Sequence, residues 1–167
     1  MTSPRVYVAD LAAYNAGHLV GEWVEATDSD ALEAAIQKAS HDGQHDWAIH
    51  DHEGFAGVDI GENMDADSLV ELATFLEEHG EEAAAYIAHV GIEHWSSSGF
   101  DDAYRGTYGS GADWAEGFLS DTGALEGLGS ELRGYFDFEK YARDCELSGD
   151  VAFCDLPSGN VAVFDNR

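Results

Sequence analysis

The sequence predicts an α+β fold built from three small modules. Three observations carry this prediction. Strand-like runs flank a helix signal in the first third, apolar residues repeat at helical spacing in the middle, and two short strands enclose a turn near the end. The predicted modules are a sheet with one helix, a helical middle, and helices with a hairpin, at residues 1–61, 62–103 and 104–167.

The first module is expected to hold three strands and one helix. The strand runs are rich in β-branched and aromatic residues and read RVYVADL (5–11), LVGEWVEA (19–26) and DWAIHDHEGF (46–55). A helix is predicted over 29–40, where Asp30 and Glu33 have the spacing of an N-terminal capping box.

The middle module is predicted to be helical. Its first helix places an apolar face at i, i+3, i+4 and i+7, formed by Leu69, Leu72, Ala73 and Leu76. We expect Ser68 and Glu71 to cap its start and Gly80 to end it. A second helix follows over 81–91, with one face formed by Ala83, Ile87 and Val90.

The last module is expected to be helix-rich over 100–123 and helical over 130–147. A hairpin is predicted over 150–166, because Pro, Ser, Gly and Asn at 157–160 form a turn signal between two apolar runs.

The charge of the chain excludes several classes of partner. Seven Lys and Arg stand against 34 Asp and Glu, for a net charge of -27. The apolar fraction of 44% is typical of a folded domain, so the acidity does not indicate disorder. Such a charge opposes binding to nucleic acid or to anionic membranes. The partners that remain are cations, basic proteins or concentrated salt.

The acids are concentrated between Lys38 and Arg105, where residues 39–104 contain 16 Asp or Glu and no Lys or Arg. Like charges at helical i, i+4 spacing each cost ~0.2–0.5 kcal/mol. The pairs with that spacing are Asp67/Glu71, Glu77/Glu81 and Glu78/Glu82. Lysine at half of these positions would stabilise the helix, so another requirement must favour the negative charge.

Two interpretations explain that requirement. One is that the chain is an acidic protein adapted to a salt-rich cytoplasm and has an unrelated binding function. Such a protein is expected to unfold at low salt. The other is imitation of DNA, which carries one charge per ~1.7 Å, so that 34 carboxylates match the phosphates of ~17 base pairs. On the second interpretation we name fifteen candidate carboxylates: Asp59, Glu62, Asp65, Asp67, Glu71, Glu77, Glu78, Glu81, Glu82, Glu93, Asp101, Asp102, Asp113, Glu116 and Asp121.

Metal, cofactor and catalytic motifs are not found. Four histidines, which lack the paired spacing of zinc modules, are expected to be solvated or hydrogen-bonded: His41, His45, His50 and His52. A calcium loop starting at Asp59 would need Gly and Glu where the chain has Met64 and Val70. Glycines 106, 109 and 111 precede a helix but follow no predicted strand, which argues against a phosphate loop. We therefore expect no cofactor, no metal and no enzymatic activity.

Location is predicted to be cytoplasmic. The first 17 residues lack a long apolar core, and no stretch approaches the ~20 apolar residues that span a bilayer. Cys145 and Cys154 are expected to be free thiols.

Three segments resemble the signature segments of the ArdA antirestriction proteins: residues 5–26, 46–55 and 131–150. The first segment is the most specific, with Tyr14-Asn15, Gly17 and the Gly21-x-Trp23 strand. The third resembles the antirestriction motif of the family through Tyr135, Phe136, Asp137, Tyr141, Ala142, Arg143 and Asp144. Their order and spacing extend over residues 5 to 165.

The resemblance implies a DNA mimic carried on mobile genetic elements that occupies the DNA-binding groove of type I restriction-modification enzymes. It also implies an elongated, curved chain of three α/β modules and a homodimer. We expect an aromatic series at i, i+4 and i+8 to lie near the two-fold contact: Phe100, Tyr104 and Tyr108. The late basic residues are expected to pair with carboxylates within the fold or across that contact: Arg105, Arg133, Lys140 and Arg143.

Overall fold

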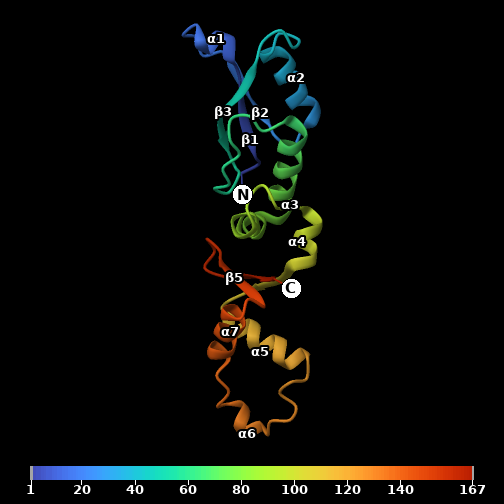
Figure 1. The fold of residues 1–167 in the computed structure, drawn as a ribbon, viewed down its shortest axis with the longest axis vertical. Helices are drawn as coiled ribbons and strands as arrows, with labels where there is room; N and C mark the ends of the chain where they lie inside the picture. The colour runs from blue at the N-terminus through green and yellow to red at the C-terminus, as the bar shows by residue number, and fades with distance from the viewer. Residues whose placement is uncertain (1, 167) are drawn as a thin grey trace. The chain divides into compact units, whose positions relative to one another are not determined.

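The computed structural model describes residues 2–166 and contains two antiparallel three-stranded sheets, each with its own helices (Figure 1). The chain divides into two compact units, Met1–Ala84 and Ala85–Arg167. The predicted α+β class is confirmed. The division into three modules stays a prediction. None of the helices in residues 2–166 has the length and apolar character needed to cross a membrane.

The sheet of the first unit has the order β2-β1-β3 and is formed by β1 (Arg5–Asp10), β2 (Gly21–Glu25) and β3 (Trp47–Glu53). All three predicted strands are thus confirmed. Gly21 pairs with Ala9 on β1, where an added Cβ would collide with the carbonyl oxygen of Val8, so only glycine allows this close approach. A short helix, α1 (Leu11–Asn15), follows β1 directly and was not predicted.

Helix α2 (Ser29–Ala39) buries Leu32 and Ala35. The capping box expected at Asp30 and Glu33 is wrong. Asp28 caps the helix instead, because its backbone is extended and its Oδ1 accepts a hydrogen bond from the Ala31 amide at 3.0 Å.

Helix α3 (Ala66–Val90) carries the predicted leucine face, and Leu69, Leu72 and Leu76 are fully buried. Asp65, and not the expected Ser68 and Glu71, holds its start: its Oδ1 accepts from the Ser68 amide at 3.0 Å.

Gly80 interrupts α3, with φ 59° and ψ −133°, which confirms the predicted end of the first helical segment. The helical i, i+4 repulsion expected for Glu77/Glu81 and Glu78/Glu82 does not apply, because both pairs span this break. It remains for Asp67 and Glu71, which lie on one uninterrupted stretch.

The sheet of the second unit has the order β4-β6-β5. The hairpin of β5 (Val151–Asp155) and β6 (Val161–Asp165) is as predicted, and the Leu156 amide donates to the Asn160 carbonyl at 2.9 Å across its turn. Strand β4 (Tyr104–Tyr108) lies between α4 (Ser97–Ala103) and α5 (Gly111–Asp121) and was not predicted.

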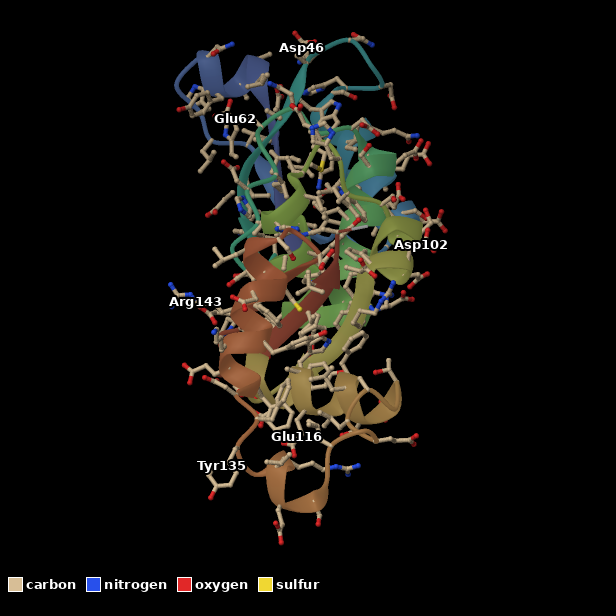
Figure 2. All side chains as sticks on the ribbon, turned by 60° about the horizontal axis from the view of Figure 1, so that its bottom comes forward. Asp46, Glu62, Asp102, Glu116, Tyr135 and Arg143 are labelled. Atoms are coloured by element: carbon tan, nitrogen blue, oxygen red, sulfur yellow. The ribbon has the colours of Figure 1, made fainter. Side chains whose placement is uncertain are left out.

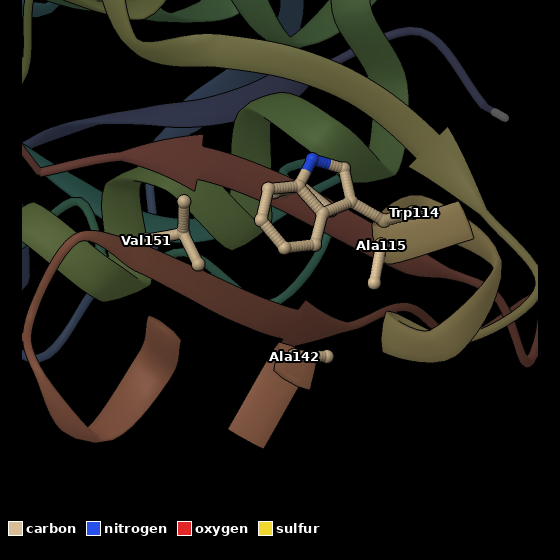
Figure 3. Close-up of a cluster of buried hydrophobic side chains, with 5 residues drawn as sticks. Trp114, Ala115, Ala142 and Val151 are labelled. Carbon is tan, nitrogen blue, oxygen red and sulfur yellow. The ribbon is translucent and has the colours of Figure 1, made fainter. Parts of the chain in front are cut away.

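The core of the second unit joins two helices to this sheet. Trp114 and Ala115 of α5, Ala142 of α7 (Phe138–Leu147), and Val151 and Val163 of the hairpin form one buried cluster (Figure 3). The predicted continuous helix over 130–147 is wrong: α6 (Ser130–Arg133) ends at Gly134, and Asp137 starts α7 by accepting from the Lys140 amide at 2.9 Å.

Candidate partner-binding surface

The fifteen candidate carboxylates are almost all on the surface. Thirteen are exposed, whereas Glu81 and Glu82 are half-buried. Figure 2 labels Glu62, Asp102 and Glu116 among them. Both units contribute, so each presents its own negatively charged surface.

The Arg and Lys ion pairs within residues 2–166 use other acids. Arg5 pairs with Glu25 and Glu53, each at 3.2 Å, and Lys38 pairs with Glu22 at 2.9 Å. In the second unit Arg105 pairs with Asp165 at 3.2 Å. None of these four acids belongs to the candidate carboxylates. Arg5, Arg105 and the helix residue Lys38 therefore pair with acids of the two sheets.

Some candidate carboxylates also hold the backbone. Asp65 caps α3, and the Ser68 amide that donates to it lowers the pKa of its carboxyl group. Asp59 accepts from the Gly61 amide at 3.1 Å, and Glu77 accepts from the Ser3 hydroxyl at 2.7 Å. For these three residues, a hydrogen bond within the fold accounts for the carboxylate.

Eight exposed candidate carboxylates have no such function within residues 2–166: Glu62, Asp67, Glu71, Glu93, Asp101, Asp102, Glu116 and Asp121. Within residues 2–166 their side chains form no hydrogen bond and no ion pair. The fold does not explain their charge, so they are the strongest members of the set for binding a positively charged partner.

The glycine-rich segment before α5 differs from the expectation. A strand, β4, does precede Gly109 and Gly111, contrary to the sequence pattern. The carboxylate of Asp113 nevertheless lies at the N-terminus of the helix. Its Oδ2 accepts a hydrogen bond from the Ser110 hydroxyl at 2.8 Å, and the Asp113 amide donates to the same hydroxyl. A carboxylate at this position repels a phosphate, so the segment does not provide a phosphate cradle.

The residues of the predicted antirestriction motif separate into two groups. Tyr141 packs against the core cluster, and Ala142 belongs to it. The Phe136 ring contacts the Phe138 ring in a tilted arrangement, with 4.9 Å between ring centroids. Tyr135, Asp137, Arg143 and Asp144 are exposed. Only this second group is available to a partner.

Tyr135 is 87% exposed in the connection between α6 and α7, and its side chain and that of Arg143 project away from the ribbon (Figure 2). Pairing within the fold is confirmed for Arg105. Arg133, Lys140 and Arg143 form no ion pair within residues 2–166, so for these three the alternative, pairing across a dimer contact, stays a prediction. These three basic side chains point to solvent.

The aromatic series expected at the dimer contact has a role inside its own unit. Phe100 is buried, and Tyr104 stacks on it with 4.8 Å between ring centroids. Both rings also contact Phe164 of β6. The hydroxyl of Tyr108 donates to the Arg105 carbonyl at 3.0 Å. A contribution of these residues to a two-fold contact stays a prediction.

The four histidines lie in three different environments. His41 and His45 lie beside Asp10, a buried residue that no sequence motif singled out. His50 contacts Tyr14 and His52 contacts Phe55 through their rings. The expected hydrogen bond is confirmed for His41, whose Nε2 lies 2.9 Å from Asp10 Oδ2.

A family model described as antirestriction protein (ArdA) matches residues 6–157 of the 167 residues of the chain. No curated protein matches the sequence.

Proposed function

The chain belongs to the ArdA family of antirestriction proteins, and from this membership we propose that it is a DNA mimic that occupies the DNA-binding groove of a type I restriction-modification enzyme. The family has an antirestriction function, acts by inhibition and not by catalysis, and interacts with restriction-modification enzymes. The mimicry, the type I target and the groove are our proposal.

The observation that carries the proposal is the set of exposed carboxylates without a function in the fold. Residues 39–104 hold 16 acids and no Lys or Arg. Among these acids, Asp67, Glu71, Asp101 and Asp102 form no ion pair with Arg or Lys within residues 2–166. A groove that binds DNA presents Lys and Arg to phosphates, and the same cations attract exposed carboxylates.

The exposed part of the predicted motif supplies a second type of contact. Tyr135, Arg143 and Asp144 offer a ring, a cation and a carboxylate to a partner. Aromatic and Arg side chains are enriched among residues that dominate binding energy, whereas dispersed charges add small increments. We propose that these residues contact the enzyme or a second copy of the chain in a homodimer.

Competition with DNA tests the proposal. A type I enzyme is bound to a fluorescent duplex containing its recognition site, and the purified protein is added at increasing concentration. We expect full displacement of the duplex, measured by fluorescence anisotropy, and loss of DNA cleavage over the same concentration range. A protein that stays folded at ~0.1 M salt and leaves the duplex bound would refute the mimicry.

A further inference from the structure

The first unit contains a second chemical feature, a cluster of one carboxylate and two imidazoles, that includes none of the candidate carboxylates. Asp10 at the end of β1 is only 4% exposed. His41 Nε2 lies 2.9 Å from Asp10 Oδ2, and His45 Nδ1 lies 3.8 Å from Asp10 Oδ1. The three potential ligand atoms all lie within 4.8 Å of one another.

We propose that Asp10, His41 and His45 form a binding site for a divalent transition-metal ion of the zinc type. Imidazole nitrogen and carboxylate oxygen are the ligands such ions prefer, at ~2.0–2.2 Å. In tetrahedral coordination two atoms bound to one ion therefore lie roughly 3.3–3.6 Å apart. The two separations from Asp10, 2.9 Å and 3.8 Å, bracket this range.

The backbone brings the two imidazoles together. After α2 the chain turns through His41 and Asp42, which have φ of 48° and 56°, and then Gly43 at 84°. The Ser40 hydroxyl accepts from the Gly43 amide at 3.1 Å, and the His45 amide returns to the Ser40 carbonyl at 2.8 Å. Two consecutive non-glycine residues with positive φ are uncommon and are strained. This conformation places the two rings 4.5 Å apart, centroid to centroid.

Asp10 is prepared as an ionised, oriented ligand. The Ala13 amide donates to its Oδ1 at 3.0 Å, and this bond, with that from His41, lowers the pKa of the carboxyl group. A backbone donor behind a ligating carboxylate fixes its direction toward the ion.

A path to the site is present. A cavity of about 310 Å³ is lined by Asp10 and His41, with Glu22 and Lys38 among its other residues. The Lys38 ammonium, the cation of this lining, is paired with Glu22 at 2.9 Å, so its repulsion of an entering ion is offset. Both histidines are exposed, which leaves further coordination positions for water.

Zinc and cobalt titrations of metal-free protein test the site. With 34 acids the chain attracts divalent ions without specificity, so the titrations are run in excess Mg²⁺, which prefers carboxylates and water to imidazole. We expect one equivalent of Zn²⁺ by calorimetry, and with Co²⁺ the visible absorption bands of a site with nitrogen ligands. Binding should weaken in acid, because protonated imidazoles cannot bind metal.

Variants assign the site. His41→Ala and His45→Ala change exposed side chains and should each weaken Zn²⁺ at least tenfold, whereas His94→Ala, an exposed histidine of the second unit, should not. Asp10→Asn keeps an oxygen for the Ala13 amide and should also weaken binding. No saturable binding in Mg²⁺, or equal binding by the His41→Ala/His45→Ala double variant, would overturn the proposal. Neither result affects the competition with DNA.

Discussion

The two units differ in how they use positive charge. Residues 1–84 carry 19 acids and two cations, Arg5 and Lys38, and both cations are engaged in ion pairs of the first sheet. Residues 85–167 carry 15 acids and five cations, and three of those cations point to solvent near the predicted antirestriction motif. The first unit is thus an almost purely negative surface, whereas the second combines negative charge with exposed Arg, Lys and Tyr side chains.

The comparison teaches that net charge and binding chemistry are separable within one acidic chain. In the first unit a partner meets dispersed carboxylates, each worth little alone. In the second, the same charge is interrupted by groups that make directional contacts. The following predictions test this difference, from the largest expected effect to the smallest.

The largest effect is expected from the core of the second unit. Trp114→Ala should lower the free energy of unfolding by ~3–5 kcal/mol, because it removes a buried ring from the cluster under α5 and α7 and leaves a cavity. Urea denaturation followed by circular dichroism measures the loss. Phe118→Ala, which truncates a partly exposed ring of the same helix, is the control and should cost much less. Equal costs would contradict the assigned core.

Salt should act differently on the protein and on the DNA that it displaces. Binding of duplex DNA loses about tenfold or more over moderate salt ranges through release of condensed counterions. Carboxylates spread over a fold are less dense than phosphates, so the affinity of the protein should fall less steeply with salt than that of DNA. A competition assay at salt concentrations from about 50 to about 300 mM measures both slopes.

The fold should persist at the low-salt end of that series, because Leu69, Leu72 and Leu76 are buried independently of ionic strength. Circular dichroism on the same samples checks this point. Unfolding of the protein at ~0.1 M salt, with no displacement of DNA, would favour salt adaptation over mimicry.

Single charge reversals in the acidic surface should have small effects. Glu71→Lys or Asp102→Lys is expected to raise the concentration for half-displacement of DNA only a few-fold, since each contributes under ~1 kcal/mol at an exposed position. Arg143→Glu in the second unit should have a larger effect if directional contacts dominate there. The same competition assay ranks all three.

A matched set separates location from total charge. Asp67, Glu71, Asp101 and Asp102 are neutralised together, and the control neutralises four exposed acids outside the candidates: Glu33, Asp51, Glu126 and Asp155. The first variant should lose more inhibition than the control. A hundredfold loss from any single reversal would point to a discrete site, and equal losses from the two sets would show that only net charge matters.

The smallest effect concerns acid stability through Asp65. Its pKa is lowered in the fold by the Ser68 amide, so its stabilisation is present above the unfolded value of ~3.9 and is lost as pH falls through the folded value. Asp65→Ala should therefore lower the Tm at pH 7, and the difference from wild type should shrink toward pH 3. Asp67→Ala, in the first turn of the helix but without a cap bond, is the control. A pH-independent difference would contradict the assigned cap.

Several elements could be predicted from the pattern of neighbouring residues. The alternation in Trp47–Glu53, the leucine spacing of α3 and the turn at 157–160 each specify a structure within a few residues, and each is confirmed. The candidate carboxylates were also readable, because acids without nearby cations stay exposed unless they are paired.

Other features depended on contacts that no local pattern records. Tyr104 and Tyr108 have helical spacing, yet β4 forms because its backbone pairs with β6 more than fifty positions later. The starts of two helices also differ from the prediction, because Ser and Asp side chains compete for the same free amides. Asp28, whose backbone is extended, caps α2, and Asp65 accepts a hydrogen bond from the Ser68 amide at the start of α3.

By itself the sequence determined the fold class, the hairpin, the leucine helix and the strongly acidic surface, because these follow from periodicity, turn chemistry and charge along neighbouring residues. Only the tertiary structure decided which acids pair with cations, which motif residues face solvent, and that Asp10 meets His41 across 31 positions. The physical reason is that hydrogen bonds and ion pairs act over a few ångströms in space. Sheet pairing brings such groups together regardless of their separation in the chain.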